Sequence, residues 1–221
     1  MKTTTISCFF LIFFAPCFLP AQTDLSEGWE VQVNKELQPP DKIMQAIGVK
    51  PGMVIGEVGA GHGRFTVYLA RKVGPAGKIL ANDIDEHAIG YLRDRCRRLG
   101  FSQVQTIIGK PDDPLFPERS LDMAIMVWVY HMIEKPDSLL KKLKQSMKAG
   151  APLVILDPVD SEIDGEFHID RSKPGHPPTI RERIEHSANE CGFELVRIET
   201  FLPKDVIFIL RAKVKTEGER E

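Results

Sequence analysis

From Leu37 onward, apolar and polar positions follow one another in blocks that predict strands and helices in alternation. Short apolar runs predict buried strands, whereas charges that recur along one side of a longer segment predict amphipathic helices. The last two apolar runs are separated only by a turn at Pro203, which favours an antiparallel pair. The strands are expected at residues 53–58, 78–83, 104–109, 121–132, 151–158, 193–201 and 205–214.

Residues suited to helix ends lie between these runs. Asp85 suits an N-cap, Gly100 suits the end of the helix that follows it, and Pro136 suits the first turn of the next helix. Further helices are predicted at residues 41–48 and 64–73 and before Cys191. Strands and helices that alternate without repeats are typical of an α/β fold with a mostly parallel sheet.

The composition indicates one folded domain and argues against nucleic acid as a partner. A chain of 221 residues with 43% hydrophobic content can bury one sizeable core, while two cores would be cramped. The formal net charge is −2, from 29 basic and 31 acidic residues, so the basic excess that a phosphate backbone requires is missing.

The first residues resemble a secretory signal peptide. Lys2 precedes an apolar core that begins at Ile6, and small Ala21 precedes Gln22. The apolar core is shorter than the about 20 residues that a membrane-spanning helix needs. We therefore expect cleavage after Ala21, export to a periplasmic or secreted location, and no stable membrane span in the mature chain; an uncleaved membrane tether is the alternative.

The expected organisation is a signal peptide at residues 1–21, an N-terminal extension at 22–36, one domain at 37–214 and a polar tail at 215–221. Removal of the signal peptide leaves only Cys96 and Cys191, too few for a disulfide framework, and these are expected to be packed thiols.

The stretch GEVGAGHGRF directly follows the first predicted strand. Glycine is used where a Cβ would collide with a neighbour or forbid the backbone dihedral, so a ligand can touch this backbone; a plain tight turn is the alternative. Gly59, Gly61 and Gly63 give GxGxG, whereas the dinucleotide fingerprint GxGxxG would need a small residue at Arg64. A nicotinamide cofactor is therefore disfavoured.

Here the chain resembles the class I S-adenosylmethionine (SAM)-dependent methyltransferases, whose first motif has an acid two residues before GxGxG, as Glu57 stands before Gly59. The resemblance implies that the loop, with Gly59, Ala60, Gly61 and Gly63, passes under the methionine part of SAM. It also implies that Glu57 orients the ammonium group of SAM, through water.

The second motif of the family matches at Asp83, which ends the second predicted strand about twenty residues after the glycines. The resemblance implies that Asp83 accepts hydrogen bonds from both ribose hydroxyls and that Ile84 lies against the adenine face. Asp83 or Asp85 could instead cap the next helix; we assign the cap to Asp85 and the ribose to Asp83.

The third motif is looser, because Lys110 stands where the family often has an aspartate. Asp112 and Asp113 follow, and one of them, preferably Asp113, is expected to bond the adenine amino group. Two solvated loop acids are the alternative.

The run DDPLFPERSLD resembles the small-molecule branch of the family, in which such a loop leads to a strand that ends in one or two histidines. Here the strand ends in Tyr130 and His131, and Met132 replaces the second histidine. Ligands of open α/β sheets lie beyond the carboxyl ends of the strands, so both side chains are expected at the pocket rim. His131 would act as a general base and Tyr130 would orient the substrate; a packed histidine is the alternative.

Histidine and aspartate side chains at His168, Asp170 and His176 could bind a metal, but their proline- and glycine-bearing loop favours a substrate-side segment, and no metal is expected.

The resemblance spans residues 38–214 and completes the prediction: a Rossmann-like, seven-stranded, mostly parallel sheet of order 3-2-1-4-5-7-6, with the last strand antiparallel and helices on both faces. The expected activity is methyl transfer from SAM to an unidentified small molecule. A non-catalytic domain that binds SAM or S-adenosylhomocysteine (SAH) and a nicotinamide oxidoreductase are the rivals, and the oligomeric state is open.

Overall fold

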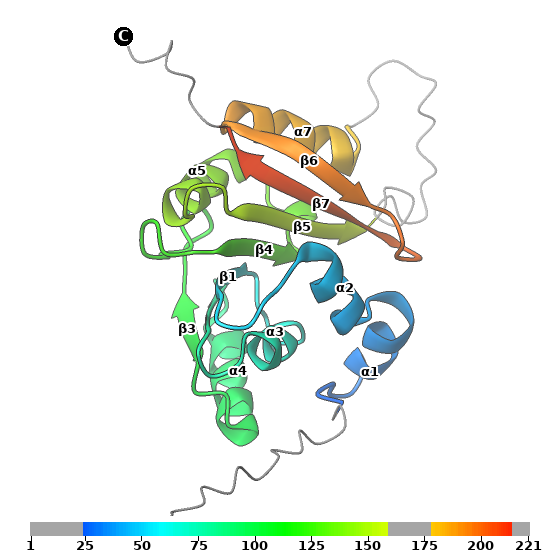
Figure 1. Ribbon diagram of the computed structural model, residues 1–221, viewed down its shortest axis with the longest axis vertical. Helices are drawn as coiled ribbons and strands as arrows, with labels where there is room; N and C mark the ends of the chain where they lie inside the picture. Colours follow the sequence, from blue (N-terminus) through cyan, green and yellow to red (C-terminus); the bar gives the residue numbers. More distant parts are fainter. Residues whose placement is uncertain (1–23, 159–177, 214–221) are drawn as a thin grey trace, which may run out of the picture.

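A computed structural model describes residues 24–158 and 178–213 of the chain (Figure 1). The predicted signal peptide, the loop with His168, Asp170 and His176, and the tail at 215–221 lie outside these residues. The elements in chain order are α1 (Glu30–Gln32), η1 (Val33–Leu37), α2 (Pro40–Ile47), β1 (Val54–Val58), α3 (Thr66–Val73), β2 (Lys78–Asp83), α4 (Glu86–Leu99), β3 (Val104–Ile108), β4 (Met123–Val127), η2 (Tyr130–Met132), α5 (Pro136–Ser146), β5 (Pro152–Pro158), α7 (Ile180–Glu190), β6 (Phe193–Glu199) and β7 (Asp205–Ala212).

The strands form one seven-stranded sheet of order β3-β2-β1-β4-β5-β7-β6. Strands β3, β2, β1, β4 and β5 pair in parallel, and β7 runs antiparallel to both β5 and β6. The predicted order and the reversed last strand are therefore confirmed. The central β4 is buried along its whole length, as expected for a strand covered on both faces.

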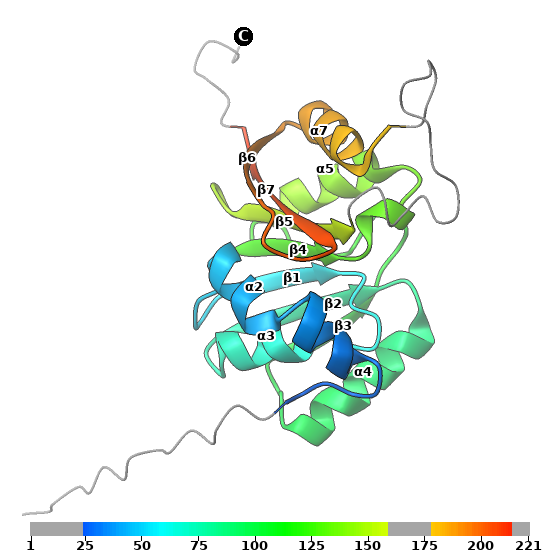
Figure 2. The ribbon, with the colours of Figure 1, turned by 90° about the vertical axis from the view of Figure 1, so that its right-hand side faces the viewer.

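Helices cover both faces of the sheet, as predicted (Figures 1 and 2). Apolar side chains of α2, α3 and α4 pack into one core cluster, and those of α5 and α7 pack into the other. Cys96 belongs to the first cluster and Cys191 to the second, and both are free, buried thiols. The parallel pairing brings the carboxyl ends of β1, β2, β4 and β5 to one edge of the sheet, where the predicted site residues lie.

Strand β4 is shorter than predicted. The sequence pattern extends the strand to residue 132, but β4 ends at Val127. Trp128 adopts a left-handed conformation with φ of 58°, which no strand can accommodate, and the chain then forms the short turn η2. This break decides the directions of Tyr130 and His131.

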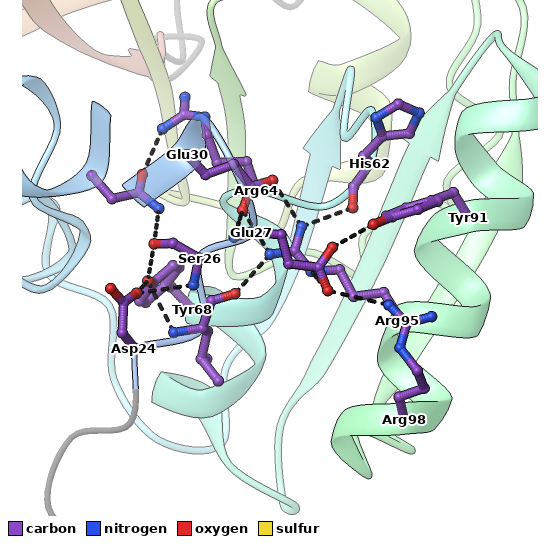
Figure 3. A network of polar contacts seen from close by, with 12 residues as sticks. Asp24, Ser26, Glu27, Glu30, His62, Arg64, Tyr68, Tyr91, Arg95 and Arg98 are labelled. Atoms are coloured by element: carbon purple, nitrogen blue, oxygen red, sulfur yellow. Dashed lines mark hydrogen bonds and ion pairs between the residues drawn. The ribbon is translucent and has the colours of Figure 1, made fainter. Parts of the chain in front are cut away.

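The described part of the N-terminal extension, from Asp24, packs against the domain. Arg95 of α4 is fully buried and its guanidinium holds this segment (Figure 3). It donates to both carboxylate oxygens of Glu30, at 2.8 and 2.7 Å, and to the carbonyl oxygen of Leu25, at 2.7 Å. It also donates to the carbonyl oxygen of His62, at 3.1 Å, so the extension is tied to the glycine loop.

No helix in residues 24–158 and 178–213 is both long enough and apolar enough to cross a bilayer.

Candidate functional site

A cavity of about 670 Å³ lies at the carboxyl edge of the sheet, where the predicted site residues converge. Its size is that of sites that hold a nucleotide-sized ligand. A second hollow of about 520 Å³ lies between the start of α5 and α7 and is lined by none of the predicted site residues. The larger cavity is lined by Val58, Gly59, Gly61, Asn82, Asp83, Ile84, Lys110, Pro111, Asp112, Trp128, Val129, Met132, Ile133, Glu134, Lys135 and Leu139.

Glycine is needed at Gly59, Gly61 and Gly63 of the loop for different physical reasons. All three have positive φ, at 71° for Gly59, 52° for Gly61 and 87° for Gly63. A Cβ at Gly59 would collide with Val129, and one at Gly63 would collide with Leu92. At Gly61 a Cβ would meet no atom within 4 Å, although this residue lines the cavity. Gly59 and Gly63 thus serve the packing of the chain, and Gly61 leaves room for a ligand.

Glu57 is a buried acid beside this loop. Its side chain is 2% exposed, and Thr66 Oγ1 donates a hydrogen bond of 2.6 Å to Oε2. Burial raises the pKa of Glu57 to about 7, although the Thr66 bond and the charge of Arg64 lower it in part. A buried carboxylate with so little compensation fits a ligand that brings a cation.

The predicted cap at Asp85 is confirmed, and Asp83 faces the cavity. Asp85 caps α4 by accepting hydrogen bonds from the backbone N–H groups of His87 and Ala88. Asp83 lines the cavity, and its Oδ2 accepts a 2.7 Å hydrogen bond from the N–H of Gly61. The acid expected to hold the ribose therefore also fixes the loop at the glycine that faces the ligand space.

Apolar side chains border the cavity near Asp83. Ile84 is 61% exposed and Met132 is 66% exposed, although both are large and apolar. Such surfaces on a cavity wall suit a flat ring.

Of the two candidate acids for the adenine end, Asp112 lines this cavity. Asp113 is absent from the cavity wall, and its carboxylate forms an ion pair of 3.6 Å with Lys142. The preference for Asp113 is therefore corrected in favour of Asp112.

Tyr130 does not lie at the pocket rim, contrary to the prediction. It is fully buried among the side chains beneath α5 and α7. Its hydroxyl donates a 3.1 Å hydrogen bond to the carbonyl oxygen of Arg183. The prediction failed because β4 ends early and η2 turns this side chain into the core, so Tyr130 has a packing role.

The side chain of His131, unlike that of Tyr130, is partly exposed. It contacts an acid that no sequence motif indicated. Its Nδ1 lies 2.8 Å from Oδ1 of Asp157, and its backbone N–H donates to Oδ2 at 3.1 Å. The imidazole is 25% exposed, whereas Asp157 at the end of β5 is fully buried. His131 does not line the 670 Å³ cavity, but the next two residues, Met132 and Ile133, do.

Arg64 was also missed as a site residue. The residue is 9% exposed, and its guanidinium donates to Asn34 Oδ1 at 3.0 Å and to Gln38 Oε1 at 2.7 Å. It also lies over the ring of Trp128, at 5.1 Å from the centroid. Because Asn34 belongs to the N-terminal extension and Gln38 follows it directly, Arg64 is a second link between this part of the chain and the glycine loop.

Within residues 24–158 and 178–213, no group of three or more histidine, cysteine or acidic side chains is arranged to hold a metal ion.

The sheet order, the glycine loop after β1 and the acid at the end of β2 define a Rossmann-like cofactor-binding domain of the methyltransferase type. Comparison with known proteins points to the same class of protein. A family described as "Methyltransferase domain" matches residues 55–150. Over these residues and in its fold the chain is similar to the class I SAM-dependent methyltransferases, and this similarity supports SAM as the cofactor.

Curated relatives are distant and longer. A ubiquinone/menaquinone biosynthesis C-methyltransferase (UbiE) of Ectopseudomonas mendocina is 27% identical over 131 residues, which cover 59% of this chain and 46% of the relative. The demethylmenaquinone methyltransferase of Bacillus subtilis is 25% identical over 125 residues, which cover 57% and 54% of the two chains. The match thus spans about half the length of these relatives.

Solved structures share the fold. A SAM-dependent methyltransferase from Aquifex aeolicus aligns with a TM-score of 0.68 and 22% identity, covering 81% of this chain and 92% of the other. The [4+2]-cyclase SpnF aligns with a TM-score of 0.67 and 17% identity, covering 88% and 86%. One fold therefore carries different chemistries, and the activity has to be argued from the site.

Proposed function

We propose that this chain transfers a methyl group from SAM to a small molecule. The observation that carries the proposal is the open space at Gly61, bordered by the carboxylate of Asp83, in a loop that also lies beside the buried carboxylate of Glu57. The match to relatives whose names describe methylation of quinone precursors supports a small-molecule acceptor.

The residues present suit the parts of SAM. Glu57 would face the ammonium group, which supplies the cation that this buried acid lacks. Asp83 would accept from the ribose hydroxyls, and Ile84 would lie against the adenine ring. Asp112 would accept from the adenine amino group.

SAM supplies, when bound, a methyl group on a sulfonium, which is reactive enough to be displaced in line by a nucleophile. The chain then has to hold the acceptor close, exclude water and take up a proton where the acceptor loses one. We assign the proton to His131, which lies beside the cavity wall and is partly exposed.

A second candidate is a domain that binds the cofactor without methyl transfer. It is favoured by Lys110 in place of the usual acid, by Met132 in place of a second histidine, and by the cyclase that shares the fold. Binding of SAH without turnover would select this candidate.

Calorimetry of the purified chain tests cofactor choice. SAH is expected to bind with a Kd in the micromolar range or below, and NADH is expected not to bind. Binding of NADH in preference to SAH would overturn the proposal and favour the oxidoreductase.

We also propose that the chain is exported, which the sequence of residues 1–21 supports. N-terminal sequencing of natively expressed protein should give a mature end at or near Gln22. An intact Met1 in a cytoplasmic fraction would overturn the proposal.

A further inference from the structure

Two residues that are 26 positions apart meet where β4 and β5 end. The carboxylate of Asp157 uses one oxygen for the imidazole Nδ1 of His131 and the other for the backbone N–H of the same residue. Both bonds hold one residue, so the carboxylate fixes the position of the His131 backbone as well as the orientation of its ring.

This arrangement selects one tautomer of the imidazole. A carboxylate can only accept, so Nδ1 carries the proton and Nε2 keeps its lone pair. Asp157 is fully buried and the imidazole is 25% exposed, so solvent or a ligand reaches the pair only through the histidine. The pair therefore presents a proton acceptor at the edge where the cofactor cavity lies.

The surroundings favour the uptake of a proton by the pair. Burial and, to a lesser extent, the charge of Asp205 raise the pKa of Asp157, the bonds to His131 lower it, and the resulting pKa is about 6. Among the residues that the structure describes, Arg183 of α7 also faces the pair, and its Nη1 donates to the carbonyl oxygen of His131 at 3.4 Å. A buried carboxylate beside a second acid is stabilised when the adjacent imidazole becomes charged.

We propose that Asp157 is the positioning residue for His131, and that the acceptor is a molecule whose hydroxyl proton must be removed, such as a phenol or an enol. This inference rests on the proposed methyl transfer and deepens it. A histidine held in this way gains nothing for a thioether or a free amine, which attack without losing a proton first.

The step balances in atoms and charge. The hydroxyl proton moves to His131 Nε2, the electron pair left on the acceptor forms the bond to the methyl carbon, and the carbon–sulfur bond of the sulfonium breaks with its pair kept by sulfur. Asp157 stabilises the imidazolium until its proton passes to solvent.

Nuclear magnetic resonance of the imidazole nitrogens tests the pair in the protein alone. The wild-type chain is expected to show His131 with the proton on Nδ1. In Asp157→Asn only one acceptor oxygen remains for two donors, so the ring is expected to shift toward the Nε2–H tautomer. Asp122→Asn is the matched control, because this acid precedes β4 at the opposite edge of the sheet, where it accepts from the N–H of Val54. A wild-type Nε2–H tautomer would overturn the proposal.

A labelled-methyl assay with SAM and a metabolite extract tests the chemistry. Wild-type products are expected to derive from hydroxyl-bearing compounds. Asp157→Asn should lower turnover about 100-fold, the scale of general base catalysis, and change SAH affinity less than twofold. If Asp157→Asn fails to fold, His131→Gln carries the same expectation.

The outcomes separate the two proposals. Full turnover in Asp157→Asn or His131→Gln, or products derived only from amines or thioethers, would overturn the present inference. Failure of the wild-type chain to bind SAH would overturn the proposed function, while the tautomer of His131 would still decide whether Asp157 positions the ring.

Discussion

The two halves of the carboxyl edge of the sheet are built differently. In the half that we assign to the cofactor (the cofactor half), after β1 and β2, the wall is backbone and short acids: Gly61 leaves space, and Asp83 accepts a hydrogen bond of 2.7 Å from its N–H. In the half that we assign to the methyl acceptor (the acceptor half), after β4 and β5, the side chains of His131 and Asp157 form a pair between elements that are distant in the sequence. The shape of the cofactor half depends on backbone dihedral angles and on the close approach of a ligand to glycine. That of the acceptor half depends on the buried carboxylate of Asp157.

This difference matches the demands of the two ligands. SAM is the cofactor of the methyltransferases that this chain resembles, so a loop whose shape glycine dictates can serve it. The methyl acceptor differs from one methyltransferase to another, and the exchange of a few side chains at strand ends adapts one scaffold to a new acceptor. Binding of the cofactor should therefore fail when the loop changes and survive changes in the acceptor half.

The largest effect is expected where the N-terminal segment anchors the cofactor half. Glu30→Ala leaves the fully buried Arg95 without its main partner and should lower the free energy of unfolding by about 3–5 kcal/mol. Glu27→Ala is the control, because this partly exposed acid lies 3.7 Å from Arg95 Nε and should cost about 1 kcal/mol or less. Chemical denaturation measures both, and equal losses would show that the segment is not anchored by this buried pair.

Glu57 should make the stability of the ligand-free chain fall as pH rises. Burial raises its pKa to about 7 in the folded chain, against an ordinary value of 4.5. Between these values the folded state keeps a proton that the unfolded state releases, so stability is lost as pH rises through that window, by about 3 kcal/mol in total. The pKa of Asp157 is also raised, to about 6, so Asp157 likewise makes the stability fall as pH rises. Denaturation from pH 4 to 8 should give a flatter profile for Glu57→Gln, and an unchanged slope would contradict the assignment.

Gly61→Val should abolish the binding of SAH, with a loss of about 100-fold or more, because the new side chain enters the ligand space and the backbone has φ of 52°. Gly52→Val is the matched control. It has φ of 82° and open space around its Cβ, but it precedes β1 at the opposite edge of the sheet. Calorimetry should show normal binding for the control; normal binding for Gly61→Val would place the cofactor elsewhere.

Asp83→Ala should weaken SAH binding by at least about tenfold, since hydrogen bonds to a charged acceptor are each worth about 1.5–3 kcal/mol. Asp85→Ala removes the cap of α4 and should cost about 1 kcal/mol of stability while leaving SAH affinity nearly unchanged. The same calorimetric titration compares the two, and the ribose assignment fails if Asp83→Ala binds as tightly as the wild type.

The cofactor half could be predicted because its signals are local. The glycine spacing, Asp83 at the end of a strand and the cap at Asp85 all lie within a few residues of the structure they determine. The sheet order followed from the family resemblance, and the reversed β7 was indicated by the short turn at Pro203.

The features that the sequence did not predict depend on contacts between residues far apart in the chain. Glu30 and Arg95 are 65 positions apart, and neither lies in a motif that points to the other. The left-handed Trp128 ends β4 although its neighbours continue an apolar pattern, so the sequence misplaced Tyr130. Asp157 carried one weak signal, an acid at the end of a predicted strand.

Methyl transfer by this chain can be measured directly with labelled SAM. Wild-type chain and Gly61→Val should be incubated with methyl-labelled SAM and a metabolite extract, and the label in the small-molecule fraction measured over time. We expect the wild-type chain to move the label from SAM to a small molecule and the variant to show only background. A wild-type chain that binds SAH yet leaves all label on SAM across the extract would contradict the account.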